Sequence, residues 1–250
     1  MIKLLASDFY RLFHNKIFVG CTAFLIIGYN LVQYAMIALI FRGDYYPAET
    51  MLTQCSNYAP IFIGLFASLF IAADFTEETI RNRIVIGSKR TNLLLSSVIV
   101  TSTVAILATV LYFGVNLLGG NLVLGGFTMT NTELLADFLV FTGAAVVISI
   151  LFTCVVYILG SSKTTPLVCP VVALVFRILA VIVLQKLYPE PGPMSDAELH
   201  ILTALDRYTP FLHLASHVHW NMASYLISWA VTAAIALAAG IIVINKKELN

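Results

Sequence analysis

Long apolar runs divide this sequence, and their lengths constrain the fold more than any motif does. They cover roughly residues 17–41, 56–73, 93–118, 134–160, 165–187 and 221–244. A helix of about 20 apolar residues crosses about 30 Å of hydrocarbon. Only 11% of the 250 residues are charged, whereas about a quarter are charged in a typical soluble domain. Because a membrane-spanning backbone must satisfy its own hydrogen bonds, these runs predict an all-α integral membrane protein with six transmembrane helices in a single domain, 1–250.

Basic residues are distributed unequally between the two sides of these predicted spans. Ten lysines and arginines precede the first run, join the second to the third or the fourth to the fifth, or follow the last, while the other side carries only Arg42, Lys186 and Arg207. By the positive-inside rule both termini are expected in the cytoplasm of a multi-pass protein. The net charge of +1 gives no reason to expect a nucleic-acid partner.

The first sixteen residues have helical amphipathic spacing but are too polar to span. Ile2, Leu5, Phe9 and Leu12 recur on one face, and Arg11 lies on the other. We expect an interfacial helix over 1–16 with its apolar face in the acyl boundary. Two roles stay open for it: an anchor for the first span, or a lever that follows movement of that span.

The segment 74–90, DFTEETIRNRIVIGSKR, is a compact charged region between the second and third runs. Asp74 followed three residues later by Glu77 looks like a capping box, and Gly87 before two basic residues is typical of a helix end. The pattern predicts a short cytosolic helix at about 75–86. Its charged residues either contact a partner or belong to a solvated connecting loop that only sets the topology.

In this segment the chain resembles a known family. The pattern DF-x-x-x-TIRN-x-x-x-x-G-x-x-R after the second span, a basic amphipathic N-terminal helix, and six spans with both termini inside look like the permease subunits of type-2 ABC exporters of Gram-positive bacteria. The close similarity of residues is confined to 74–90, and Glu78 stands where many members carry glycine.

The resemblance implies a coupling helix that rests on a separate ATP-binding cassette subunit. The residues it assigns to coupling are Asp74, Glu77, Glu78, Arg81 and Arg83. The chain has no G-x-x-x-x-G-K-[ST] loop, so ATP and Mg would be bound by the partner subunit and this chain would need no cofactor. A second permease copy, or a related permease, is also implied, in the bacterial cell membrane.

The family layout turns spans two and five toward the transport path, which implies path roles for Asn57, Arg177 and Gln185. Arg177 lies near mid-membrane, where an unpaired charge costs at least about 2.5–3.5 kcal/mol. It either contacts a carboxylate-bearing cargo, pairs across a dimer, or pairs with Asp137 in its own chain. The amides Asn30, Gln33, Asn57 and Asn116 are more typical of interhelical hydrogen bonds than of ligand contacts.

The region 188–219 is the largest predicted on the outer side. Its prolines interrupt helices, and Pro210 interrupts the segment a second time. We expect a short extracellular re-entrant or interfacial element here. His213, His217 and His219 raise the possibility of a metal site, although no cysteine or carboxylate is placed to complete it. The four cysteines are expected to be buried apolar filler.

These features together favour an exporter permease, not an enzyme, that moves an amphipathic or lipophilic cargo such as a membrane-active peptide or peptide antibiotic. One alternative is an intramembrane metalloprotease, suggested by the Glu77–Glu78 pair, Arg81 and His217-x-x-x-Asn221. The arginine spacing differs from that family, and the topology separates the glutamates from His217. Another alternative is a non-transporting immunity or sensor membrane protein.

Overall fold

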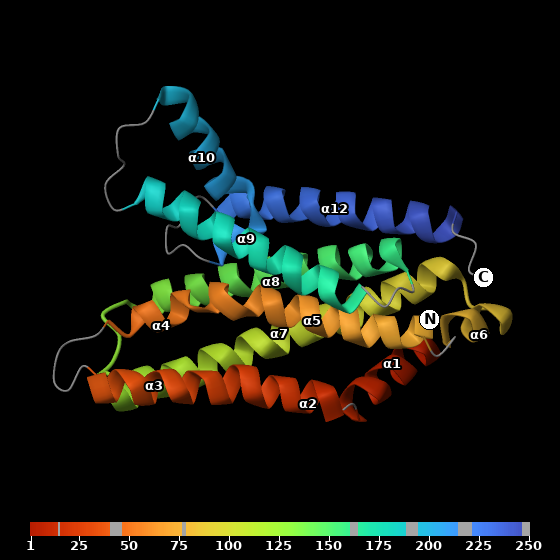
Figure 1. The fold of residues 1–250 in the computed structure, drawn as a ribbon, viewed down its shortest axis with the longest axis horizontal. Helices are drawn as coiled ribbons and strands as arrows, with labels where there is room; N and C mark the ends of the chain where they lie inside the picture. The colour runs from red at the N-terminus through yellow and green to blue at the C-terminus, as the bar shows by residue number, and fades with distance from the viewer. Residues whose placement is uncertain are drawn as a thin grey trace.

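The computed structural model describes residues 1–14, 16–40, 47–76, 79–160, 165–188, 195–214 and 222–246. Within these ranges the chain forms helices and turns and no strand, which confirms the all-α prediction. Most of the long helices run side by side along one axis and build an elongated bundle (Figure 1).

The helices follow one another with few intervening residues. In chain order they are α1 (Ile2–His14), α2 (Lys16–Thr22), the π-helix η1 (Ala23–Gly28), α3 (Tyr29–Ile40), α4 (Glu49–Thr53), α5 (Cys55–Thr76), α6 (Thr79–Val85), α7 (Arg90–Val123), α8 (Asn131–Leu159), α9 (Thr165–Leu187), α10 (Asp196–Tyr208), α11 (Pro210–His213) and α12 (Met222–Lys246).

Among the described residues four helices are long and apolar enough to cross a membrane: α7, α8, α9 and α12. The count rises to five if the bent pair α5–α6 is one span. The predicted first span, 17–41, differs because η1 interrupts it and leaves only a shorter apolar helix, Ile26–Ile40. The Asn30 side-chain amide donates to the Ile26 carbonyl at 2.5 Å, so a side chain enters the helical hydrogen-bond ladder next to the π-helix.

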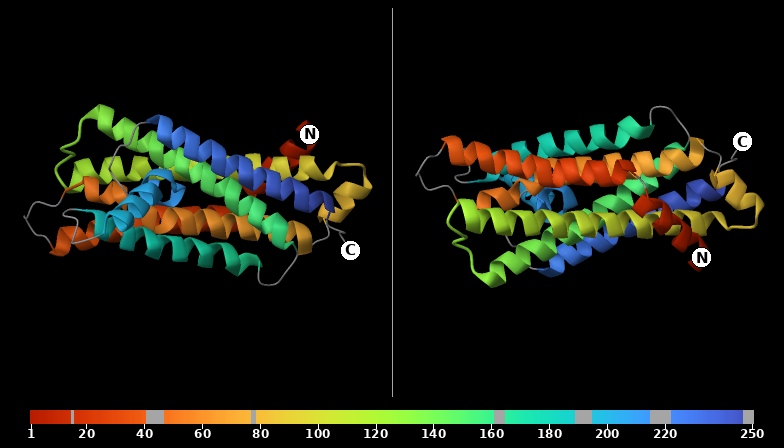
Figure 2. Two further views of the ribbon diagram at one scale, coloured as in Figure 1. Left: turned by 90° about the horizontal axis from the view of Figure 1, so that it is seen from above. Right: turned by 90° about the horizontal axis from the view of Figure 1, so that it is seen from below.

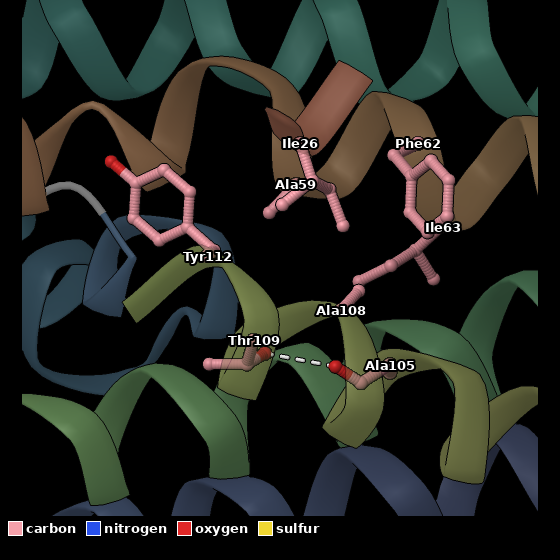
Figure 3. A pocket seen from close by; sticks show the side chains of 8 residues that line it. All are labelled: Ile26, Ala59, Phe62, Ile63, Ala105, Ala108, Thr109 and Tyr112. Carbon is pink, nitrogen blue, oxygen red and sulfur yellow. Dashed lines mark hydrogen bonds between the residues drawn. The ribbon is translucent and has the colours of Figure 1, made fainter. Parts of the chain in front are cut away.

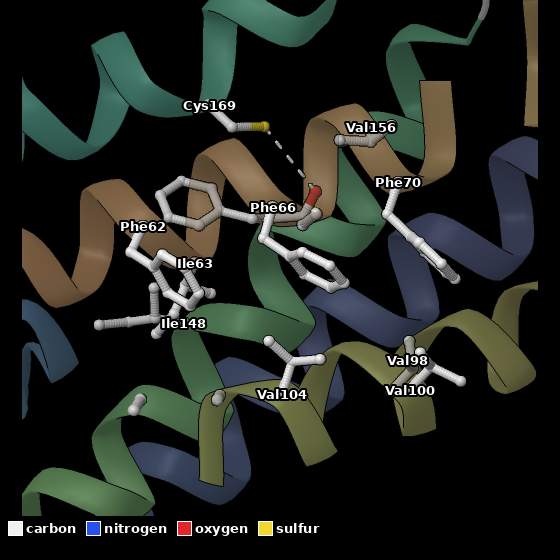
Figure 4. Packing of buried hydrophobic residues seen from close by; sticks show 14 of the residues in the cluster. Phe62, Ile63, Phe66, Phe70, Val98, Val100, Val104, Ile148, Val156 and Cys169 are labelled. Atoms are coloured by element: carbon white, nitrogen blue, oxygen red, sulfur yellow. Dashed lines mark hydrogen bonds between the residues drawn. The ribbon is translucent and has the colours of Figure 1, made fainter. Parts of the chain in front are cut away.

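The core lies where α5, α7 and α8 meet. Phe62, Ile63 and Phe66 of α5 pack there with Val104 of α7 and Ile148 of α8 (Figure 4). In a water-soluble protein, burial of a large apolar side chain of this kind stabilises the fold by about 1.5–3 kcal/mol. Between helices in lipid, the same side chains stabilise the bundle mainly through close packing.

Helix α5 also approaches α9 closely at Gly64. A Cβ atom there would lie 3.2 Å from the backbone carbon and oxygen of Cys169 and 3.2 Å from the Phe152 ring. Glycine therefore permits this packing. Cys169 and Cys154 are buried free thiols, as predicted for apolar filler, while the side chains of Cys21 and Cys55 lie outside the described residues.

Helix α1 begins and helix α12 ends at the same end of the bundle, the end that carries α6 (Figures 1 and 2). At the opposite end α10 projects from the bundle, with Ser195 accepting a hydrogen bond from the Glu198 amide as its N-cap. Pro210 occupies the first turn of α11, which confirms the predicted second interruption. All four residues of α11 are buried, so this part of the 188–219 segment packs into the bundle.

Candidate functional site

Helix α6 is set at an angle to the bundle by its connections at both ends. It makes an angle of 57° with α5. At its C-terminus Gly87 has φ +99°, the Gly87 amide donates to Ile84 O at 2.9 Å and the Ser88 amide donates to Arg83 O at 2.9 Å. These paired bonds form a Schellman motif, in which glycine adopts the left-handed conformation at low cost. The predicted helix end at Gly87 is confirmed.

The start of the segment differs from the prediction. Asp74 lies inside the last turns of α5, which continues to Thr76, so Asp74 is not the N-cap of a separate helix beginning at about 75. Its side chain is only 3% exposed and is engaged by another element. The capping interpretation failed because a tertiary partner holds the carboxylate, which local sequence spacing does not reveal.

That partner is Arg11 of α1. Its guanidinium makes a two-point ion pair with the Asp74 carboxylate, with Nη2 donating to Oδ2 at 2.8 Å and Nη1 donating to Oδ1. The same guanidinium lies 4.0 Å from the centre of the Phe70 ring. A planar guanidinium suits both contacts, because its edge matches a carboxylate and its face stacks on an aromatic ring.

A second ion pair connects α1 to α6 and α7. The Asp8 carboxylate accepts a hydrogen bond from Arg83 Nη1 at 2.8 Å and another from Ser96 Oγ at 2.6 Å. The Asp8 side chain is 2% exposed and that of Arg83 is 18% exposed. We call Asp8, Arg11, Asp74, Arg83 and Ser96 the α1 network. These contacts join α1 to α5, α6 and α7.

The packing of α1 differs from the predicted interfacial helix. Leu12 is fully buried and Leu5 and Phe9 are partly buried against the bundle core, whereas Ile2 is 85% exposed. The predicted apolar face is therefore divided between protein and the exterior, and Arg11, expected on the outer polar face, is partly buried in an ion pair.

Of the predicted coupling residues, the structure brings Asp74 and Arg83 into the α1 network. Arg81 lies on the exposed side of α6, and Glu77 and Glu78 lie outside the described residues. Sequence reasoning missed Asp8 and Ser96. A signal for Asp8 exists, because it lies four residues before the buried Leu12 and so shares its helical face, where an acidic residue needs a partner.

The exposed side of α6 and the turn that follows it, together called the tip of α6, combine apolar and basic side chains. Val85 is 79% exposed and Ile86 is 85% exposed, and Arg81 and Lys89 are exposed beside them. This tip extends past the end of the bundle where α1 begins and α12 ends (Figure 1).

The predicted path residues do not form one site. Arg177 is half-buried and Gln185 is exposed, two turns further along α9, and the side chain of Asn57 lies outside the described residues. Asp137 is itself buried on α8, and among the described residues no ion pair joins it to Arg177, so the intrachain pair, one of the three alternatives for Arg177, is not formed.

The predicted interhelical role of the buried amides is confirmed for two of them. Asn116 of α7 donates to Asn30 Oδ1 at 3.2 Å, and the Tyr34 hydroxyl donates to Asn116 Oδ1 at 3.0 Å. Gln33 donates to Gln54 Oε1 at 2.5 Å. These bonds join α3 to α7 and to the residue that precedes α5.

A small cavity lies between η1, α5 and α7 and is lined by apolar side chains together with Thr109 and Tyr112 (Figure 3). Its volume is about 10 Å³, and Thr109 Oγ1 already donates to Ala105 O at 2.9 Å. About 10–15 Å³ is the least that holds one water molecule. This cavity therefore cannot hold a cargo molecule in this conformation.

Both ring nitrogens of His213 on α11 make hydrogen bonds within the protein. Trp229 Nε1 donates to its Nδ1 at 3.1 Å, so the ring proton resides on Nε2, which donates to Arg207 O at 3.1 Å. Burial lowers the pKa of His213 to about 4, against the opposing effect of the backbone hydrogen bonds. Both nitrogens are thus occupied. No group of metal-binding side chains occurs among the described residues, and His217 and His219 lie outside them.

Comparison with protein-family models and with curated proteins finds no match to this chain.

Proposed function

We propose that this chain is the permease subunit of an ATP-driven exporter, in which a separate ATP-binding cassette subunit hydrolyses ATP and the permease moves an amphipathic or lipophilic cargo outward. The observation that supports this most is the arrangement of α6. It is a short helix beyond the end of the bundle, bent from α5, with an exposed tip and a buried ion pair to α1. Movement of a cytosolic partner bound to such a helix would be transmitted to the helices of the bundle.

The α1 network gives that motion a route. Force on α6 acts directly on α5 and α7 through the chain, and on α1 through Arg83 and Asp8. Helix α1 leads into α2 after a single residue, so the first apolar run would move as well. In this proposal α1 is the lever of the two roles considered for it, and the helices rearrange between inward-open and outward-open states as ATP binds and is hydrolysed.

The proposal includes six crossings of a bacterial cell membrane, with both termini in the cytosol. The interrupted run α2–η1–α3 would be the first crossing, because it lies along the bundle beside the other long helices (Figures 1 and 2). A second copy of this chain or a related permease would complete the path. The cargo class follows from the apolar composition, 60% hydrophobic, and a membrane-active peptide or peptide antibiotic fits it.

The test is affinity purification of a tagged protein in mild detergent, followed by identification of co-purifying proteins and an assay of ATP hydrolysis. We expect a stoichiometric ATP-binding subunit. Ile86→Asp should abolish its recovery, because it places a charge on the exposed apolar tip. Leu122→Asp is the matched control, since Leu122 is 83% exposed and Ile86 85%, but Leu122 lies at the other end of α7.

Arg81→Ala separates binding from coupling. We expect this variant to insert in the membrane and to lose cargo-dependent ATP hydrolysis. Normal export by Arg81→Ala and Ile86→Asp would show that α6 is not the coupling surface. Recovery of the membrane protein alone, in several detergents, would contradict the exporter proposal and favour a stand-alone immunity or sensor protein.

A further inference from the structure

We infer that the groove between the N-terminal run and α7 binds the cargo of the proposed exporter, and that the bound part is an uncharged lipophilic chain with a carbonyl oxygen, as in an amide or an ester. This inference rests on the proposed function and narrows it, because it gives the chemical class of the cargo. Four observations support it: the size and depth of the groove, its uncharged lining, a buried hydroxyl group without a hydrogen bond, and the bonds that join the helices on either side.

The groove lies between α2, η1 and α7 and has a volume of about 340 Å³. Sites for small molecules have volumes of about 300–1,000 Å³. Its α7 side runs from Val104 to Leu111, at the middle of the apolar run 93–118. Figure 2 shows α7 beside the N-terminal run. Val19 is 56% exposed and Ile27 43% exposed, so the groove is open on the outer face of the bundle.

The groove also adjoins the interior of the bundle. Ala108 of α7 lines both the groove and the small cavity between η1, α5 and α7 (Figure 3). In a bundle that spans the membrane, a molecule dissolved in the bilayer would therefore meet the groove first and the interior next.

The described residues that line the groove carry no charge. Most are large apolar side chains, among them Phe18, Ile27, Leu107 and Leu111. A charge buried without a partner is costly, so this lining favours an uncharged, apolar occupant. Thr22 is the one residue among them whose side chain has a polar atom.

The Thr22 hydroxyl oxygen is buried and makes no hydrogen bond within the described part of the chain. A threonine inside a helix can bond its hydroxyl to the carbonyl four residues earlier. Thr103 of α7 does so, donating to Ile99 O at 2.8 Å, and Thr109 behaves likewise. A buried hydroxyl without a partner is unfavourable, and a carbonyl oxygen of a bound molecule would accept its proton. The hydroxyl therefore favours a ligand with an acceptor over a plain hydrocarbon.

Hydrogen bonds join the neighbouring helices to α7 on either side of the groove. Asn116 of α7 donates to Asn30 Oδ1 at 3.2 Å, which joins α3 to α7. Ser96 of α7 donates to Asp8 Oδ2 at 2.6 Å, which joins α1 to α7. The π-helix η1 lies between these two joints and lines the groove. Turns of π-helix inside α-helices are frequent at functional sites.

A membrane phospholipid could supply the same chemistry, because its chains carry ester carbonyls. Those carbonyls lie at the edge of the hydrocarbon, about 15 Å from its middle. The groove lies at the middle of the apolar run of α7. A cargo with a carbonyl inside its apolar part, such as an acylated peptide, matches this depth.

The experiment is photolabelling of purified protein, without an ATPase, in nanodiscs of a diether phosphatidylcholine, which has no ester carbonyl. Two alkyl diazirine probes of equal length are compared at equal membrane concentrations: one has a secondary amide in the chain, and the other has methylenes in its place. We expect the amide probe to label 18–27 and 104–111 about fivefold more than the hydrocarbon probe, as one net hydrogen bond provides. Thr22→Val should abolish this ratio and leave labelling by the hydrocarbon probe unchanged.

Thr142→Val is the matched control. The Thr142 hydroxyl is also buried without a hydrogen bond among the described residues, but Thr142 lies on α8 and does not line the groove. Ala23→Phe places a ring in the groove and should abolish labelling by both probes, whereas Ala230→Phe, at an exposed position of α12, should not. Equal labelling of the wild type by the two probes would overturn the inference, and this comparison requires no variant to fold. Persistence of the ratio in a folded Thr22→Val protein would overturn it as well.

Nanodiscs of the ordinary diester phosphatidylcholine distinguish the cargo from the lipid. An unchanged ratio in this lipid supports a cargo site, and loss of the ratio would show that phospholipid esters occupy the groove and would overturn its assignment to cargo. Because no ATPase is present, failure of these measurements leaves the exporter proposal standing. Failure to recover an ATPase subunit would, in turn, leave the measured amide preference intact.

Discussion

At the scale of single residues, the buried carboxylate of Asp8 should contribute most to the stability of the α1 network. It accepts hydrogen bonds from Arg83 and Ser96 while almost fully buried. Hydrogen bonds that involve a charged group contribute about 1.5–3 kcal/mol, and Asp8→Ala would remove two of them. We expect this variant to lower the free energy of unfolding in detergent by about 2–3 kcal/mol, measured by chemical denaturation.

Glu198→Ala is the control for Asp8→Ala, because it also removes a carboxylate from a basic partner. The Lys186–Glu198 pair is exposed, at 52% and 39% for the two side chains. Exposed pairs contribute about 0–1 kcal/mol. Equal losses of stability in the two variants would show that burial of Asp8 has no energetic consequence.

His213 gives a residue-scale prediction for pH. Burial lowers its pKa in the folded protein to about 4, whereas an unfolded histidine has a pKa near 6.5. Between these values the unfolded state binds the proton and the folded state does not, so stability should fall as the pH falls from about 6.5 to about 4 and change no further below that. The difference corresponds to about 3 kcal/mol for this group, to be followed by thermal denaturation across the pH range.

A histidine variant isolates this contribution. His213→Asn removes the titrating ring and should flatten the pH dependence between about 4 and 6.5. His200→Asn, at an exposed position of α10, should leave the slope unchanged. A slope that survives in His213→Asn would assign the pH dependence to other groups.

At the scale of elements, the end of α6 depends on the backbone of Gly87. Nothing lies within 4 Å of a Cβ atom built there, so Gly87→Ala would cause no clash, only strain from φ +99°. A residue with a Cβ atom pays about 1–2 kcal/mol in the left-handed region. We expect Gly87→Ala to lower stability by that amount and to increase hydrogen exchange of the α6 amides.

Gly114→Ala is the matched substitution, because a Cβ atom there also has nothing within 4 Å but lies inside the helix α7. Alanine is favoured over glycine in a helix interior by about 0.5–1 kcal/mol. The two variants should therefore change stability in opposite directions. If both variants were destabilised, the added methyl group would be harmful at both positions, and the loss at Gly87 could not be assigned to its backbone angle.

The elements also show what the sequence could predict. The long apolar runs predicted the helices, and Gly87 predicted the end of α6. Both signals are local, because the length of an apolar run and a glycine at a helix end can be read from neighbouring residues. The ion pairs of Asp74 and Arg83 could not be predicted, since their partners Arg11 and Asp8 lie 63 and 75 residues away. The interruption of the first run was missed as well, because hydropathy does not record how a helical turn is hydrogen-bonded.

At the scale of the whole molecule, the bundle has two chemically different ends. One end holds the start of α1, the end of α12, the α1 network and the tip of α6, and the other holds α10 and the turn between α7 and α8 (Figure 2). The sequence predicts the excess of basic residues at the first end, and by the positive-inside rule we propose that this end faces the cytoplasm. The orientation of the whole bundle relative to the membrane can therefore be tested by a single experiment.

Labelling of single cysteines with a membrane-impermeant maleimide tests this orientation in a background with the four native cysteines replaced. We expect Ile86→Cys, at the tip of α6, to react only after the cells are permeabilised, and Leu199→Cys, exposed on α10, to react in intact cells. Helices α6 and α10 lie at opposite ends of the bundle (Figure 1), so the two positions must label in opposite ways if the helices span the membrane. Labelling of both in intact cells would contradict a membrane-spanning bundle, and the reverse pattern would place α6 outside, where no ATPase could reach it.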